Sequence, residues 1–136
     1  MADTKIRVER PLSPHIQVYR WTLTMAMSIA HRATGIALYF GTILLAWWLI
    51  SASNGPNRYA EVQWFMSTFI GRLVLFGYTW ALLHHMLGGI RHLIWDLGYA
   101  FGPNEREWLT RATSIGSIVL TLVLWIVGYL GMGGTR

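Results

Sequence analysis

The chain has 136 residues, of which 54% are hydrophobic and only 12% are charged. A soluble domain of this size would struggle to stay in solution with that balance, so most apolar residues are expected to face lipid. The net charge of +5 comes from basic residues that flank apolar blocks instead of forming one stripe, which argues against nucleic acid as a partner. With no cysteine in the chain, disulfides and thiolate metal sites are excluded, and histidine remains as the good transition-metal ligand.

The segment before the first long apolar run, residues 1–24, is expected to be cytoplasmic or interfacial. Pro11 and Pro14 favour a non-helical conformation there. Residues 1–10 contain acidic side chains and lack the apolar core and cleavage site of a secretory signal. The membrane domain is expected to cover residues 25–136.

Three apolar runs follow, and each includes eighteen consecutive residues without Asp, Glu, Lys or Arg. At a rise of about 1.5 Å per residue, such a run crosses most of a bilayer core of about 30 Å. The sequence therefore predicts an all-α integral membrane protein with three transmembrane helices in a bundle. The predicted spans are about 27–51, 65–92 and 113–132, joined by turns at 53–57 and 102–104.

Basic residues are distributed unequally between the two ends of these spans. Eight precede the first span, lie at its start or follow the second span, whereas three lie in the first loop or at the C-terminus. The positive-inside rule then places the N-terminus in the cytoplasm and the C-terminus outside. A bacterial inner membrane is expected, in preference to the mitochondrial inner membrane.

Among the ionisable residues of the first two spans, four stand out: His31, Arg32, His84 and His85. An arginine at the centre of a membrane helix costs at least about 2.5 kcal/mol, so each such residue needs a partner. With the N-terminus inside, all four lie in the cytoplasmic half of the membrane. The sequence therefore predicts one polar pocket between the first and second spans.

The second span carries a pattern suited to a flat macrocycle. His85, Gly88, Gly89 and His92 are spaced i, i+3, i+4 and i+7, which places them on one face of a helix. A neutral imidazole binds haem iron, and glycines one turn away leave room for the porphyrin. His92, with Arg91 beside it, is placed to meet propionates or lipid headgroups. The alternative interpretation is close helix packing at the glycines and an interhelical hydrogen bond from His85.

The first span offers two polar side chains on a shared face, because Ser28 and Arg32 are four residues apart. A hydroxyl and a guanidinium in a site of low dielectric would stabilise negative charge on the carbonyl oxygens of a quinone. The alternative is that Arg32 extends to phospholipid headgroups.

Two motifs make the sequence similar to a known family. Residues 10–20 (RPLSPHIQVYR) and 28–35 (SIAHRATG) resemble the patterns RPxSPHxxxY and SxxHRxTG, and residues 85–96 (HMLGGIRHLIWD) resemble HxxxGxRHLxxD. These patterns belong to the large cytochrome b membrane-anchor subunit of succinate dehydrogenase, also called succinate:quinone oxidoreductase or respiratory complex II. The resemblance covers nearly the whole chain and its plan of three spans.

The resemblance implies that His85 is an axial ligand of haem b and that a smaller membrane-anchor subunit supplies the second axial histidine. It implies that Ser28 and Arg32 line the ubiquinone site and that His31 lies close to the haem propionates. No catalytic residue is expected in this chain. In the family a flavoprotein subunit oxidises succinate, and an iron-sulfur subunit passes electrons to quinone at the membrane surface.

Two points stay open at the level of sequence. The adjacent His84 points about 100° away from His85 on a helix and is expected to form a hydrogen bond or to pack, although either imidazole could meet iron. Two rival functions remain: the anchor of a quinol:fumarate reductase, or a haem-free membrane scaffold whose histidines relay protons.

Overall fold

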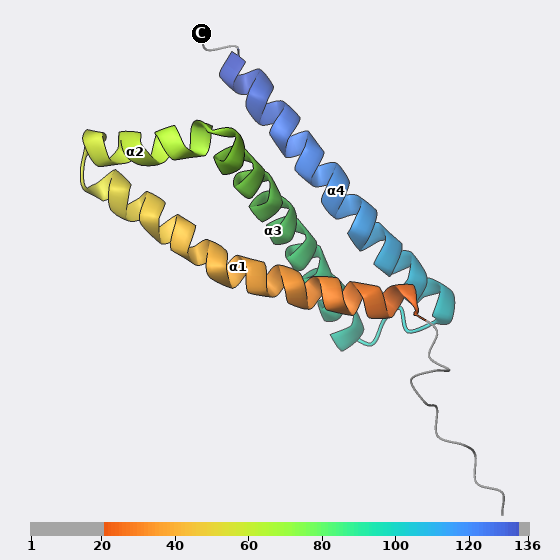
Figure 1. Cartoon of the computed structure of the whole chain (residues 1–136). Helices are drawn as coiled ribbons and strands as arrows, with labels where there is room; N and C mark the ends of the chain where they lie inside the picture. The colour runs from red at the N-terminus through yellow and green to blue at the C-terminus, as the bar shows by residue number, and fades with distance from the viewer. Residues whose placement is uncertain (1–20, 134–136) are drawn as a thin grey trace, which may run out of the picture.

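Residues 21–133 are described by the computed structural model, and they form four α-helices without any strand among them (Figure 1). The helices are α1 (Leu23–Ser53), α2 (Pro56–Ser67), α3 (Phe69–Asp96) and α4 (Pro103–Gly133). Three of them, α1, α3 and α4, are long and apolar enough to cross a membrane. The expected all-α fold with three such helices is confirmed. Most of the segment 1–24 lies outside the described residues.

The first helix is longer than the predicted span 27–51, because a capping residue starts it earlier. Thr22 has an extended backbone, and its side-chain oxygen accepts a hydrogen bond from the Met25 N–H at 3.3 Å. The helix ends before Gly55, whose φ of 99° lies in the left-handed region that favours glycine. With 31 residues the helix is about 46 Å long, so it exceeds a bilayer core of about 30 Å and must tilt or protrude.

The predicted second span, 65–92, starts four residues before α3 does. Thr68 has an extended backbone between α2 and α3, and its hydroxyl accepts a hydrogen bond from the Gly71 N–H at 3.1 Å. A Cβ on Gly71 would collide with the carbonyl oxygen of Phe65, so only glycine lets α3 fold back against α2. The chain therefore bends sharply here, and a separate short helix replaces the expected loop.

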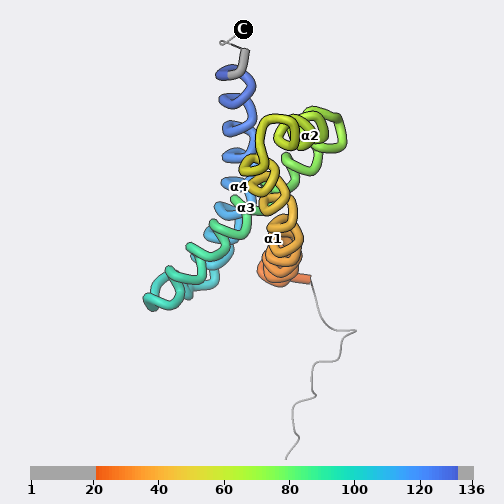
Figure 2. Tube along the Cα trace, turned by 90° about the vertical axis from the view of Figure 1, so that its left-hand side faces the viewer, coloured from red at the N-terminus to blue at the C-terminus, as the bar shows by residue number. Residues whose placement is uncertain are grey.

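The helices meet closely at one end of the molecule and separate toward the other. Figure 1 shows α1 and α3 diverging toward α2, which joins their far ends, while α4 runs along α3. Figure 2 shows the same arrangement from the side. Near its start α1 also contacts α4, where the Ser114 hydroxyl lies 2.8 Å from the Met27 sulfur.

Polar side chains, rather than large apolar ones, fill most of the interface between α3 and α4. Thr110, Ser117 and Thr121 are fully or almost fully buried on α4, where Ser117 lies opposite His84 of α3 and Thr110 opposite Arg91. Meanwhile large apolar side chains are exposed along all the helices. Small and hydroxyl-bearing residues allow membrane helices to approach closely. This distribution fits a bundle whose outer surface is covered by lipid.

Candidate functional site

Where α1 and α3 cross, a glycine of each helix faces a histidine ring of the other helix. A Cβ on Gly88 of α3 would collide with the His31 ring of α1. In the opposite direction, a Cβ on Gly35 of α1 would lie 3.1 Å from Cε1 of His85. Each helix thus offers a gap to a histidine of the other, and the two backbones come close enough for both rings to fit between them.

His31 and His85 stack face to face at this crossing, with ring centroids 4.0 Å apart and planes inclined by 19°. The Nδ1 atom of His85 lies 3.2 Å from the backbone carbonyl oxygen of His31 and 3.4 Å from the Thr34 hydroxyl. Because a carbonyl oxygen only accepts hydrogen bonds, Nδ1 carries the proton in a neutral ring. The lone pair of Nε2 then lies in the ring plane, directed away from the stacked face, and is available to a metal.

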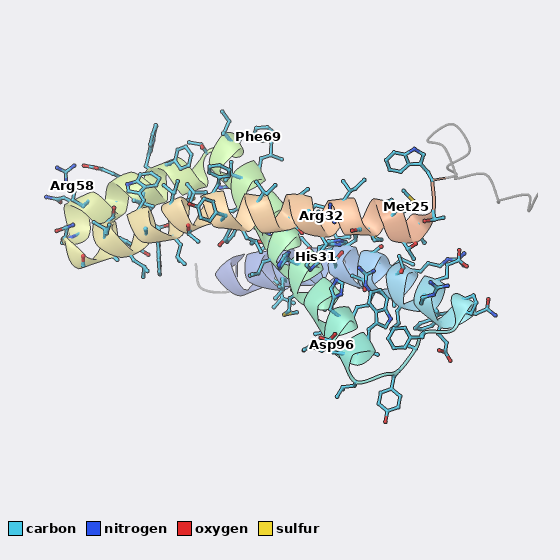
Figure 3. The ribbon with its side chains drawn as sticks, turned by 90° about the horizontal axis from the view of Figure 1, so that it is seen from below. Met25, His31, Arg32, Arg58, Phe69 and Asp96 are labelled. Carbon is cyan, nitrogen blue, oxygen red and sulfur yellow. The ribbon has the colours of Figure 1, made fainter. Side chains whose placement is uncertain are left out.

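A cavity of about 300 Å³ opens beside this stack and receives side chains from α1, α3 and α4. We call it the histidine pocket, and it is lined by Thr24, Ser28, His31, Arg32, Arg91, His92, Trp95 and Thr110. Figure 3 shows His31 and Arg32 on α1 above the crossing with α3. Four of the sequence-predicted site residues, Ser28, His31, Arg32 and His92, therefore share one cavity. His85 is held behind His31 and adjoins the pocket through the stack.

Three nitrogen atoms around the histidine pocket have unmet hydrogen-bonding capacity. Within residues 21–133, the buried side-chain polar atoms without a partner are His31 Nε2, Arg91 Nε and Trp95 Nε1. All three residues line the pocket. A buried polar group without a partner costs about 1–3 kcal/mol, so the pocket is suited to a ligand with hydrogen-bonding oxygens.

The predicted quinone-site residues make no side-chain hydrogen bond within residues 21–133. Ser28 and Arg32 are exposed, and no side-chain hydrogen bond joins either of them to another described residue. His92 is also exposed, and its ring meets the edge of His31 at a centroid distance of 5.5 Å. The motif at 10–20 lies outside the described residues.

His84 and His85 are adjacent but serve different interfaces. His84 is 2% exposed and faces α4, where its Nδ1 lies 3.3 Å from the Ser117 hydroxyl. The hydrogen bond expected for His84 is therefore present. Of the four residues predicted to share one pocket, His31 and Arg32 line it, whereas His84 and His85 do not.

Comparison with known proteins identifies the family of this chain. The family model described as "Succinate dehydrogenase/Fumarate reductase transmembrane subunit" matches residues 6–128. The chain belongs to this family. Among its relatives, the succinate dehydrogenase cytochrome b556 subunit of Paracoccus denitrificans is 41% identical over 130 residues, covering 96% of this chain and 99% of the relative.

Two further relatives extend the match to other organisms. The cytochrome b556 subunit of Rickettsia felis is 38% identical, covering 93% of this chain and all of the relative. The mitochondrial cytochrome b560 subunit of Sus scrofa is 42% identical, covering 90% of this chain and 69% of the relative. The chain is a cytochrome b membrane-anchor subunit of succinate dehydrogenase and a multi-pass membrane protein.

Sequence reasoning missed Arg91 as a residue of this subunit's interior. It is 5% exposed, donates to the Thr110 hydroxyl at 3.4 Å and lies 5.2 Å from the centre of the Trp95 ring. A signal was present in the spacing. His84 and Arg91 are seven residues apart on α3, as Thr110 and Ser117 are on α4, so two polar pairs align across antiparallel helices.

Proposed function

We propose that this subunit binds haem b through His85, shares it with a smaller membrane-anchor subunit, and forms part of the site where ubiquinone is reduced. The observation that carries the proposal is the state of His85: its Nδ1 donates to the His31 carbonyl, which leaves Nε2 for iron. The relatives' names include cytochrome b, which denotes a haem protein.

The residues around His85 suit a porphyrin. Histidines that bind metals commonly donate their other ring N–H to a carbonyl, and His85 does so to His31. One turn along α3, a Cβ on Gly89 would meet nothing within 4 Å, so this face leaves space for a flat group. His31 and His92 would meet the propionates, with Nε2 of His31 lacking a partner in the described chain. When bound, haem iron supplies one-electron redox chemistry.

The histidine pocket suits the polar head of a quinone. Ser28 and Arg32 reach it from α1, while Arg91 and Trp95 present unpartnered N–H groups from α3. Fixed donors in a site of low dielectric stabilise negative charge as it forms on carbonyl oxygens. Donors from two helices therefore surround the cavity in which the acceptor would be held.

The proposed orientation in the membrane puts the histidine pocket on the side where the soluble subunits would dock. We place the N-terminus in the cytoplasm of a bacterial cell with the chain in the inner membrane, because eight of eleven basic residues fall on that side. The iron-sulfur subunit would dock beside the histidine pocket and carry electrons from the flavoprotein, and membrane lipid and the smaller anchor would cover the exposed apolar surface.

The test is Arg32→Ala in the intact complex purified from membranes. Loss of a charge-assisted hydrogen bond is worth about 1.5–3 kcal/mol, so succinate-driven ubiquinone reduction should fall at least about tenfold. Succinate-driven reduction of a water-soluble dye should not change, because the dye takes electrons before quinone.

The matched control is Arg58→Ala, since Arg58 lies on α2 and pairs with Glu61 at 3.2 Å. It should keep both activities. Normal ubiquinone reduction by Arg32→Ala would contradict the quinone assignment and favour contact of Arg32 with lipid headgroups.

A further inference from the structure

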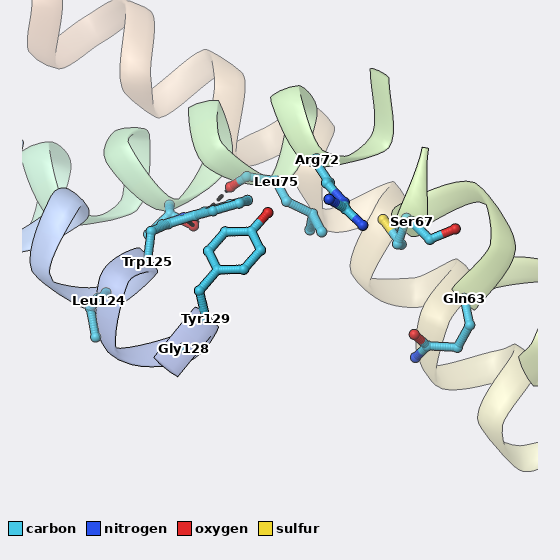
Figure 4. Close-up of a pocket in the computed structure, with 10 residues that line it drawn as sticks. Gln63, Ser67, Arg72, Leu75, Leu124, Trp125, Gly128 and Tyr129 are labelled. Carbon is cyan, nitrogen blue, oxygen red and sulfur yellow. Dashed lines mark hydrogen bonds between the residues drawn. The ribbon is translucent and has the colours of Figure 1, made fainter. Parts of the chain in front are cut away.

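A second cavity, of about 530 Å³, lies where α2, α3 and α4 meet, at the other end of α3 from the histidine pocket. We call it the α2 pocket. Figure 4 shows Arg72 of α3 between Ser67 and Gln63 of α2 on one side and Trp125 and Tyr129 of α4 on the other. None of the residues assigned to haem or quinone lines it.

One end of the α2 pocket is polar and positively charged. Arg72 lies in the first turn of α3, immediately before the apolar run that starts at Leu73, and so marks the boundary of that run. The ion pairs among the described residues are Arg58 with Glu61 and Arg111 with Glu107, so no described carboxylate neutralises Arg72. Gln63 and Ser67 add further polar groups beside it.

The remainder of the pocket is an apolar wall that is held in place. Trp125 donates from Nε1 to the Thr79 hydroxyl at 3.3 Å, and its ring meets the edge of Phe76 at a centroid distance of 5.3 Å. Leu75 and Leu124 complete this wall. A ligand with a charged head group and a hydrocarbon tail would match the polar end and the apolar wall of the α2 pocket.

A neighbouring cavity indicates that the ligand has two hydrocarbon tails instead of one. It measures about 270 Å³, lies between α1, α2 and α3, and shares Gln63, Met66 and Leu75 with the α2 pocket. Its other walls are mostly apolar, with Leu44, Leu45 and Trp48 from α1. Two largely apolar cavities therefore adjoin at Gln63, close to the cation Arg72.

We propose that the α2 pocket binds one membrane phospholipid. Its phosphate would accept hydrogen bonds from Arg72, one acyl chain would lie along Leu75 and Leu124, and the second chain would enter the neighbouring cavity. A phosphate oxygen is a strong acceptor for a guanidinium, and the apolar walls of the two cavities match acyl chains. The lipid would hold α2 against α3 and α4 at the end of the bundle where α1 and α3 diverge.

The experiment uses the intact complex in detergent and measures binding of phosphatidylglycerol by native mass spectrometry. Arg72→Gln should weaken binding by about tenfold or more, because it removes a charge-assisted hydrogen bond. Gly128→Leu should prevent it, since a Cβ on Gly128 meets nothing within 4 Å and a leucine there would fill the pocket. Leucine also favours a helix more than glycine does, so loss of folding would not explain the result.

The matched control is Arg58→Gln on α2, outside the lining of the α2 pocket, which should bind the lipid as wild type does. Diacylglycerol and inorganic phosphate, each carrying half of the lipid's chemistry, should compete weakly. Wild-type binding by either Arg72→Gln or Gly128→Leu would overturn the proposal, and so would displacement of phosphatidylglycerol by stoichiometric ubiquinone. Succinate-driven ubiquinone reduction should be unchanged in all three variants, which separates this site from the proposed quinone site.

Discussion

The polar residues on the two sides of α3 have different surroundings. Toward α4, His84 is buried and its Nδ1 lies 3.3 Å from the Ser117 hydroxyl. Toward α1, His85 stacks on His31, uses one nitrogen on a backbone carbonyl and keeps the other free. Two adjacent histidines of one membrane helix therefore pack against two different helices, and we propose that the one facing α1 binds haem iron.

The difference shows how a binding residue is recognised inside a membrane protein. Polarity alone does not separate the two histidines, because both sit within the same apolar run. What separates them is their surroundings: His84 is buried against α4, whereas His85 stacks on His31, a residue that lines the histidine pocket. The three unpartnered nitrogens lie at the histidine pocket between α1, α3 and α4, where the ligands are expected.

The largest effect should come from replacing each of the two adjacent histidines in turn. His85→Ala should abolish the b-type haem absorption bands of the purified complex, because it removes the proposed iron ligand. His84→Ala should keep those bands and lower only thermal stability. Visible spectra of the reduced proteins test this prediction. Haem bands that are retained by His85→Ala and lost from His84→Ala would assign the iron to His84.

The next largest effect should follow from filling the gap at the helix crossing. Gly88→Ala places a methyl group against the His31 ring, so the complex should lose about 1–3 kcal/mol of stability as the helices separate. Its thermal unfolding can be followed by circular dichroism.

Gly89→Ala is the matched control for that substitution, since its methyl group meets open space in this chain. It should keep the stability of the haem-free protein but reduce haem content, because the methyl group would occupy the face proposed for the porphyrin. Equal haem content in Gly89→Ala and the wild type would place the porphyrin elsewhere.

A smaller effect is expected at the interface with α4. Ser117→Ala removes the hydroxyl beside His84 and leaves a buried imidazole nitrogen without its partner, so stability should fall by about 1 kcal/mol. Haem content should not change. A loss of haem from Ser117→Ala would show that the two sides of α3 are coupled.

The smallest effect should come from Thr34, whose hydroxyl lies 2.9 Å from the His31 carbonyl and 3.4 Å from His85 Nδ1. Thr34→Val should shift the midpoint potential of the haem slightly and change stability by less than about 0.6 kcal/mol. Thr42→Val, which loses a similar hydroxyl contact with the Tyr39 carbonyl on an exposed face, should leave the potential unchanged. Identical potentials in both variants would exclude a role for Thr34 beside the haem.

Much of this protein could be predicted from local features of its sequence. The three long helices follow from apolar runs whose length matches a bilayer, and the placement of His31 and His85 in the same half of the membrane follows from helix direction. The separate helix α2 could not be read in this way. It depends on Thr68 capping α3 and on the close approach of Gly71 to Phe65, a contact between two helices.

The sequence by itself determined that three helices cross the membrane and that histidines, an arginine and glycines gather on two of them. Only the tertiary structure decided that Arg91 turns inward, that His84 binds α4, and that unpartnered nitrogens surround one pocket. The physical reason is that helices in lipid are apolar on nearly every side, so periodicity does not reveal which side meets protein. Close packing of small residues and the pairing of polar groups make that choice, and both depend on the neighbouring helix.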